Sequence, residues 1–170
     1  VIMTPVDETL EVKLGELLRL HGWRLAIAES CTGGLIGHRI TNVAGSSTYY
    51  MGSITAYAYE AKVRLLGVRW ETLELHGAVS RETVAEMARG VRMALAADIG
   101  MAVSGIAGPS GGTPEKPVGL TCIGLSTPLH ELSWSFVWSG DRRQNKEQSA
   151  DAVLRLLLEY LGQHAAESLI

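Results

Sequence analysis

The sequence predicts an α/β fold, with one layered domain in which a mixed β-sheet is flanked by helices. Short apolar runs alternate with amphipathic helical patterns along most of the chain, which is typical of parallel strands joined by helices. Two late strand patterns, at 118–125 and 132–138, follow each other without a helix and indicate an antiparallel pair. The length of 170 residues suits one core, so we expect a single domain over 1–170.

The first part of the chain is predicted as helix, strand, helix. Apolar residues at helical spacing predict an amphipathic helix over about residues 8–21, and Gly22 provides its end. The apolar run 24–28 predicts a buried strand. A second helix is expected after the glycine pair that follows, and the turn-forming segment 44–47 ends it.

The middle of the chain predicts one strand and two helices. Aromatic and β-branched residues predict a strand over 49–57, and a short helix over 60–66 is stopped by Gly67. Ser80 fits the N-cap of a long helix. One apolar stripe marks that helix, and it consists of Val84, Met87, Ala88, Val91 and Leu95.

The last part predicts three strands and a closing helix. The runs 99–103 and 118–125 fit interior strands, separated by a long glycine-rich loop. The alternation at 132–138 predicts a strand with one face well buried and its aromatic residues in the core. A helix is expected from Arg142 onward, and its apolar face is formed by Val153, Leu154, Leu157, Leu158 and Leu161.

Composition argues against several classes of function. A net charge of −3 and a pI near 6.0, with no run of Lys or Arg, disfavour nucleic-acid binding. No apolar stretch approaches the roughly 20 residues that cross a bilayer, and no signal-peptide pattern is seen, so we expect no membrane partner and a cytoplasmic location. Cys31 and Cys122 give no disulfide framework or metal-ligand spacing, so neither a metal nor another cofactor is predicted.

The most informative segment is 28–34, Ala-Glu-Ser-Cys-Thr-Gly-Gly, where an apolar strand ends in reactive side chains at a predicted helix start. Ser30 and Cys31 are both candidate nucleophiles. The three residues that follow are expected to leave main-chain N–H groups free at the positive end of a helix dipole, where an anion binds well. The segment therefore predicts a nucleophile beside an anion site.

A serine nucleophile needs a base that accepts its proton. The histidines are scattered along the sequence without a triad-like context, whereas Lys62 lies just beyond the strand predicted to end at Tyr57. Because a desolvated lysine can act as the base of a Ser–Lys pair, Ser30 and Lys62 are the preferred pair.

Each of these residues also has an ordinary structural interpretation that the sequence leaves open. Ser30 fits a helix cap, Lys62 a solvated helix lysine and Tyr57 a half-buried strand tyrosine. Cys31 fits a small buried thiol as well as a nucleophile.

The loop 104–112 is a second candidate for binding an anion. Successive bare N–H groups after a strand form anion-binding concavities and oxyanion holes. The glycine spacing matches neither a Walker loop nor a dinucleotide fingerprint, which argues against ATP hydrolysis and NAD-dependent hydride transfer. Arg142, at the start of the last helix, can bind a phosphate or belong to an ordinary charged first turn.

Motifs along most of the chain resemble the CinA C-terminal domain family. They are the segments 28–34 and 44–47, Tyr57 with Glu60-Ala61-Lys62, and the segments 66–68, 77–80, 105–112 and 116–119. Two segments depart from the family pattern. Ala58-Tyr59 stands where the family usually carries Ser-Asn, and 52–56 replaces a more common Gly-Gly-Val pattern.

The resemblance implies an amidase that hydrolyses the carboxamide of nicotinamide mononucleotide to nicotinate mononucleotide and ammonia, in the recycling of NAD. The family's functional serine, tyrosine and lysine correspond to Ser30, Tyr57 and Lys62, with Ser30 attacking, Lys62 as base and Tyr57 holding the lysine or sharing its proton. A homodimer is also implied, and nothing here corresponds to the molybdopterin-binding-like second domain of some members. The candidate substrate-binding residues are Glu29, Cys31, Thr32, Gly33, Gly34, Gly105, Ala107, Gly108, Ser110, Gly111, Gly112 and Arg142.

Two rival interpretations stay open at this point. The chain can be a non-catalytic nucleotide-binding module that acts through a partner, or a purely structural interaction domain. The sequence also leaves open which of the two glycine-containing loops binds the phosphate and which stabilises the oxyanion.

Overall fold

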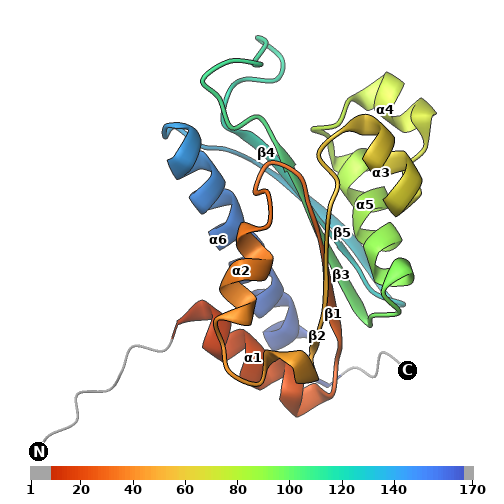
Figure 1. Cartoon of the computed structure of the whole chain (residues 1–170), viewed down its shortest axis with the longest axis vertical. Coiled ribbons are helices and arrows are strands. Elements are labelled where there is room, and N and C mark those ends of the chain that lie inside the picture. Colours follow the sequence, from red (N-terminus) through yellow and green to blue (C-terminus); the bar gives the residue numbers. More distant parts are fainter. Residues whose placement is uncertain (1–8, 167–170) are drawn as a thin grey trace, which may run out of the picture.

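A computed structural model describes residues 9–166 and contains a five-stranded sheet between two layers of helices (Figure 1). The strand order is β2-β1-β3-β4-β5; the pairs β2–β1 and β1–β3 are parallel, and β3–β4 and β4–β5 are antiparallel. The α/β fold with a mixed sheet is therefore confirmed. In chain order the elements are α1 (Leu10–His21), β1 (Leu25–Glu29), α2 (Leu35–Thr41), the 3-10 helix η1 (Ser46–Thr48), β2 (Tyr50–Thr55), α3 (Tyr59–Leu66), α4 (Trp70–His76), α5 (Arg81–Ala94), β3 (Ile99–Gly105), β4 (Leu120–Ser126), β5 (Glu131–Val137) and α6 (Arg142–Gln163).

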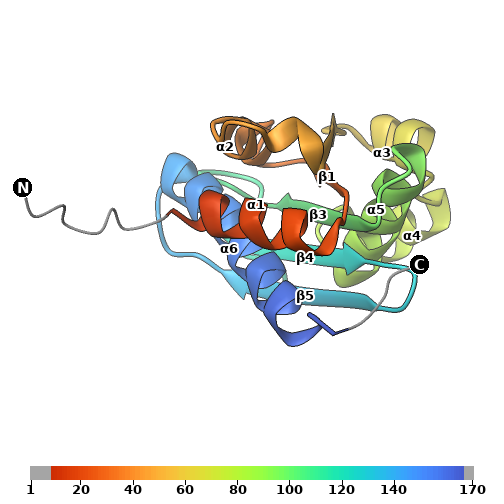
Figure 2. The same ribbon diagram turned by 90° about the horizontal axis from the view of Figure 1, so that it is seen from below.

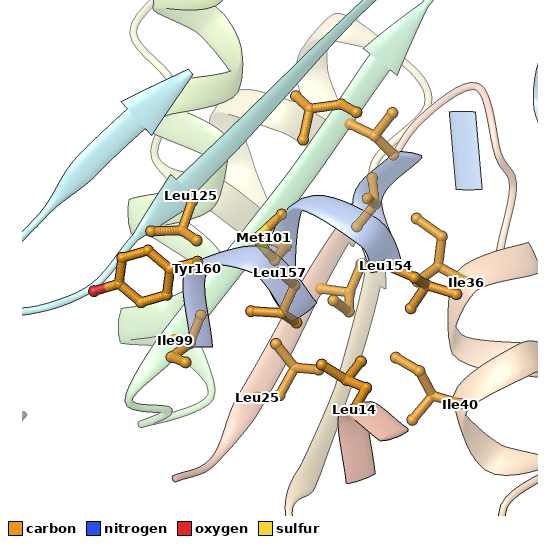
Figure 3. Packing of buried hydrophobic residues seen from close by; sticks show 14 of the residues in the cluster. Leu14, Leu25, Ile36, Ile40, Ile99, Met101, Leu125, Leu154, Leu157 and Tyr160 are labelled. Atoms are coloured by element: carbon orange, nitrogen blue, oxygen red, sulfur yellow. The ribbon is translucent and has the colours of Figure 1, made fainter. Parts of the chain in front are cut away.

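The two helical layers cover opposite faces of the sheet. Helices α1, α2 and α6 lie on one face and α3, α4 and α5 on the other, as Figures 1 and 2 both show. The larger core lies under the first layer, where Leu14, Ile36 and Leu157 meet the strand residues Leu25 and Met101 (Figure 3). This layer supplies most of the large buried side chains, which is the main source of hydrophobic stabilisation.

The second core is built from smaller residues, which let α5 lie close to the sheet. Ala26, Ala28 and Ala102 point into it from β1 and β3. A Cβ placed on Gly100 would lie only 2.1 Å from the carbonyl oxygen of Ala88, and one on Gly124 would lie 2.4 Å from that of Val84. Side chains at these two positions would therefore push α5 away from the strands.

The structure differs from the predicted elements in several places. Helix α4 and η1 were not predicted, because seven and three residues carry too little periodicity to be recognised. Strand β2 ends at Thr55 rather than at 57, since the chain turns there into α3. Trp134 and Phe136 of β5 pack against the first core, as predicted, but they are only half-buried because β5 is an edge strand.

The neighbouring strands β1 and β2 connect to helices on opposite faces of the sheet. After β1 the chain passes into α2 on one face, and after β2 it passes into α3 on the other face. In open α/β sheets, the place where neighbouring strands connect to opposite faces leaves a crevice at the carboxyl ends of the strands, and ligands bind there. The segments predicted to carry chemistry, 28–34 and 57–62, both lie at this point. Over residues 9–166, no helix has the length and apolar character needed to span a membrane.

Candidate active site

Ser30 and Lys62 meet at the carboxyl ends of β1 and β2. The N–H of Ser30 donates to the carbonyl of Val103 at 3.2 Å, which holds the serine in line with the sheet. Lys62 Nζ lies 3.0 Å from Ser30 Oγ. The alternative of Ser30 as a helix cap is wrong, because α2 has Gly34 as its N-cap residue and receives no side-chain cap from there.

Lys62 is a buried lysine, not a solvated one, since its exposed fraction is 1%. Its Nζ also lies 2.8 Å from the carbonyl oxygen of Ala56 and 2.9 Å from that of Tyr57. Burial lowers the pKa of Lys62 to about 8. A neutral amine has two hydrogens and one lone pair, so it can donate to both carbonyls while its lone pair accepts the hydroxyl proton of Ser30. This arrangement is suited to a general base.

Tyr57 reaches Lys62 through its main chain rather than through its phenol ring. The carbonyl of Tyr57 accepts from Lys62 Nζ, whereas the side chain is 63% exposed and its hydroxyl accepts a hydrogen bond from Arg142 at 3.3 Å. The interpretation as a half-buried strand tyrosine is wrong, because β2 ends two residues earlier. The phenol is exposed beside Arg142, where it can contact a ligand.

The turn from β1 into α2, residues 29–34, is called the corner below. Cys31 is a buried thiol on the opposite side of the corner from Lys62. Burial raises its pKa to about 11, so it stays protonated and poorly nucleophilic at neutral pH. A Cβ placed on Gly105 would lie 3.0 Å from Cys31 Sγ, so the sulfur packs directly against β3. Of the two candidate nucleophiles, Ser30 is the one beside a base.

The expectation of free N–H groups at the start of α2 is wrong for most of that turn. The carboxylate of Glu29, which is fully buried, accepts the N–H groups of Gly34, Ile36 and Gly37 at 3.0–3.2 Å and the hydroxyl of Thr32 at 2.6 Å. The protein thus supplies its own anion at this helix start. Glu29, predicted to bind substrate, instead holds the corner from inside.

Three further N–H groups follow Ser30, those of Cys31, Thr32 and Gly33. The N–H of Gly33 turns back to the carbonyl of Ser30 at 3.1 Å. The N–H groups of Cys31 and Thr32 donate to no main-chain acceptor within residues 9–166. Cys31 and Thr32, the two residues that follow the nucleophile, therefore carry the main-chain donors that can still bind an oxyanion.

The second glycine-containing loop is attached to the start of α6. Arg142 donates to the carbonyl of Gly108 at 2.8 Å, and the side-chain amide of Asn145 donates to that of Ala107 at 3.0 Å. Asn145 was missed from the sequence because a single buried asparagine within a helix carries no motif. Through these contacts α6 holds the loop above the carboxyl end of β3.

The glycines of this loop have different surroundings. Gly105 packs on Cys31, and a Cβ on Gly108 or Gly112 would lie 2.5–2.6 Å from atoms of Val118, so these positions serve close packing within the loop. The remaining predicted residues of the loop, Ser110 and Gly111, are exposed at its tip.

Three cations from the first turns of α6 line one cavity. Arg142, Arg143 and Lys146 line a cavity of about 450 Å³ together with Leu35 and Glu147. A Cβ on Gly33 would lie 3.9 Å from Lys146 Nζ, which places this ammonium beside the corner. Lys146 was not predicted, although its position one helical turn after Arg142 was a usable signal. A neighbouring cavity of about 470 Å³ is lined by Ala107, Pro109, Val118, Gly140, Asp141, Arg142 and Arg143.

The described part of the chain has no group of three or more His, Cys, Asp or Glu side chains placed to hold a metal ion. What the site offers is a hydroxyl next to a buried amine, a free main-chain donor, and a cationic rim. These groups suit acyl transfer on a substrate that carries a negative charge.

Comparisons with known proteins agree on one family. The family model described as CinA C-terminal domain matches residues 7–161. A CinA-like protein from Chloroherpeton thalassium is 49% identical over 159 residues, and one from Chlorobaculum tepidum is 48% identical over 157. The alignments cover 91% and 89% of this chain, but the chain spans only 38% and 37% of the length of these relatives.

Solved structures indicate the same family, and the match covers nearly the whole length of each. A competence-damaged protein (CinA) superfamily protein from Klebsiella pneumoniae superposes with a TM-score of 0.87 at 33% identity, over 91% of this chain and 96% of its own. The competence/damage inducible protein CihA from Agrobacterium tumefaciens superposes with a TM-score of 0.81 at 34% identity, over 94% and 99%. The chain belongs to the CinA C-terminal domain family.

Proposed function

We propose that this protein is an amidohydrolase that converts nicotinamide mononucleotide to nicotinate mononucleotide and ammonia. The observation that carries the proposal is the contact of 3.0 Å between Ser30 Oγ and the buried Lys62 Nζ. The family resemblance supplies the substrate, and the cationic rim of α6 is compatible with its phosphate.

The first half of the reaction would acylate the serine. Ser30 Oγ forms a bond to the carboxamide carbon while its proton passes to neutral Lys62. The tetrahedral intermediate then collapses, the C–N bond breaks, and Lys62 returns the proton to the nitrogen, which leaves as ammonia. The two carbonyls that hold Lys62 keep its Nζ in place through both transfers.

The second half would release the acid. A water molecule attacks the acyl carbon and gives its proton to Lys62, the bond from Ser30 Oγ to carbon breaks, and Lys62 returns a proton to Ser30. The product is the carboxylic acid, which gives its proton to the solvent and leaves as the carboxylate, and the free enzyme is restored.

The contacts of Glu29 favour one division of duties between the two loops. Because this carboxylate already occupies the start of α2, a second anion is disfavoured there. We assign the oxyanion to the N–H groups of Cys31 and Thr32, which follow the nucleophile. We assign the phosphate to Arg142 and Lys146, with Tyr57 beside Arg142.

The decisive experiment is an ammonia-release assay on nicotinamide mononucleotide, with free nicotinamide and the dinucleotide run in parallel. Ser30→Ala should abolish ammonia release while leaving binding of the mononucleotide within about tenfold. Cys31→Ala is the matched control, since removing a buried thiol that is not the nucleophile should leave most of the turnover.

Other results would redirect the proposal. Substantial turnover by Ser30→Ala would refute the nucleophile. Binding of the mononucleotide by the wild-type protein without any ammonia would support the nucleotide-binding module instead. Cytoplasmic action as a homodimer in NAD recycling belongs to the same proposal, and light scattering during size-exclusion chromatography would test the dimer.

A further inference from the structure

Ser104, near the carboxyl end of β3, carries a buried hydroxyl that has no hydrogen-bond partner within residues 9–166. The residue is 1% exposed. Burying a hydroxyl without a partner costs stability, and such groups are rare in folded proteins. An unpartnered hydroxyl at the end of a central strand therefore points to a function that the ligand-free protein does not display.

The register of the sheet places Ser104 beside Ser30. Strands β1 and β3 are parallel, with Glu29 paired to Val103, and the N–H of Ser30 continues this ladder by donating to the carbonyl of Val103. The next residues along the two strands, Ser30 and Ser104, are therefore neighbours across the sheet.

Both serines project toward the helical layer that contains Lys62. Side chains alternate along a strand, and Ala28 and Ala102, two positions earlier, both lie in the core under α3 and α5. On the opposite face, Cys31 Sγ would lie 3.0 Å from a Cβ on Gly105, so the next pair of residues is adjacent as well. The alternation thus continues past the end of β1 and brings the hydroxyl of Ser104 to the side of Ser30 that faces the base.

The spacing explains why the two hydroxyls do not bond to each other. Neighbouring strands lie about 4.8 Å apart, which is longer than the roughly 2.8 Å of a bond between two hydroxyls. One polar atom bound near Ser30 Oγ, however, can hydrogen-bond to Ser104 as well. In enzymes without ligand, catalytic hydrogen bonds are often open and close only in the substrate complex.

We propose that Ser104 is a further catalytic residue, whose hydroxyl hydrogen-bonds first to the carboxamide nitrogen and then to the water molecule that replaces the departed ammonia. This inference rests on the proposed function. Ser104 neither gains nor loses a proton in either step; it orients the nitrogen while the C–N bond breaks and the water while the new C–O bond forms. Ammonia departs from the same side of the acyl carbon from which the water later attacks. One hydroxyl can therefore hydrogen-bond to each of them in turn.

The test uses p-nitrophenyl acetate as a probe of Ser30, because it does not depend on the natural substrate. Acetylation of Ser30 releases nitrophenolate in a burst, and hydrolysis of acetyl-Ser30 sets the steady-state rate. In Ser104→Ala the burst should stay near one nitrophenolate per chain, since nitrophenolate leaves without needing a proton. The steady-state rate should fall by about tenfold or more, as should ammonia release from nicotinamide mononucleotide.

A matched control separates this role from a structural one. Ser126 is a fully buried strand serine whose hydroxyl accepts a hydrogen bond from Arg92 at 3.1 Å. Ser126→Ala should lower the melting temperature and keep the steady-state rate. Ser104→Ala should keep or raise the melting temperature, because the lost hydroxyl had no partner, and should lower the rate.

Each outcome decides a different point. A wild-type steady-state rate in Ser104→Ala overturns the inference, and so does a melting temperature that falls together with the burst. If the wild-type protein is acetylated at Ser30 and behaves as expected but releases no ammonia from the mononucleotide, the proposed substrate is wrong and the role of Ser104 stands. If wild-type Ser30 is not acetylated and the protein releases no ammonia from the mononucleotide, both are wrong.

Discussion

Lys62 is held by three oxygen atoms in a position that water scarcely reaches. Ser30 Oγ and the carbonyl oxygens of Ala56 and Tyr57 all lie within 3.0 Å of Nζ. None of these three groups carries a negative charge, so their hydrogen bonds do not make up for the hydration that the ammonium form loses on burial, and the pKa of Lys62 falls. Burial thus makes a base from a side chain that is normally a cation, and the two main-chain carbonyls hold it in place.

The rate of ammonia release should follow the titration of this base. With the pKa of Lys62 lowered to about 8, the neutral amine is the minor form at pH 7 and becomes the major form above pH 8. We therefore expect kcat/KM for nicotinamide mononucleotide to rise about tenfold per pH unit below this pKa and to level off above it. A profile that is flat from pH 6 to 9 would contradict the base role.

Lys62→Arg provides the control for that profile. The guanidinium keeps the positive charge but cannot lose its proton in this pH range. The variant should be inactive at every pH, and near-normal activity would show that only the charge is needed.

At the scale of single elements, helix α2 begins on a carboxylate from the preceding strand. Glu29 gathers three N–H groups and one hydroxyl of the turn that follows Ser30. The nucleophile is therefore fixed from both sides, by the ladder to β3 before it and by the bound turn after it.

Glu29→Gln should loosen this turn. The amide keeps one acceptor oxygen but presents an NH₂ group to N–H donors, so at least one donor loses its partner in a dry environment. We expect the free energy of unfolding to fall by about 2 kcal/mol or more, measured by urea denaturation. The same replacement at Glu16, an exposed position of α1, should change it by less than about 0.5 kcal/mol, and equal effects at the two sites would refute the capping role.

The elements show what the sequence could and could not predict. The corner at Ser30 was recognisable because strand, reactive side chains and glycines follow one another within seven residues, and α5 because its apolar stripe starts at the N-cap Ser80. The role of Glu29 could not be recognised from the sequence, because a glutamate in a motif looks the same whether its carboxylate binds a ligand or main-chain N–H groups. Asn145 and Ser104 were missed because their meaning depends on contacts between distant segments.

At the scale of the whole molecule, the site depends on how the two helical layers meet the sheet. Ser30 is attached to β1, whereas Lys62 belongs to α3, which packs on α5. Gly90 makes this packing possible, because a Cβ there would lie 1.8 Å from the carbonyl oxygen of Leu66 at the end of α3. The distance between nucleophile and base is thus set partly by a glycine far from both.

Gly90→Ala should separate α3 from α5. We expect a loss of at least about 2 kcal/mol in the free energy of unfolding, together with reduced ammonia release as Lys62 shifts. Gly162→Ala is the matched control, because Gly162 is an exposed helical glycine with no atom within 4 Å of its added Cβ. That replacement should raise stability by about 0.5–1 kcal/mol and leave activity unchanged. Equal stabilities of the two variants would contradict the packing argument.

The sheet also sets where the molecule can be attached to something else. Helix α1 begins and α6 ends at the end of the sheet opposite to the loop between β3 and β4, which lies at the same end as the carboxyl end of β1 (Figure 1). A tether joined ahead of α1 or behind α6 would therefore anchor the molecule by its far end. Immobilised on a bead or a sensor chip in this way, the protein would present the crevice to the solution, so substrate capture and turnover could be followed on the same surface.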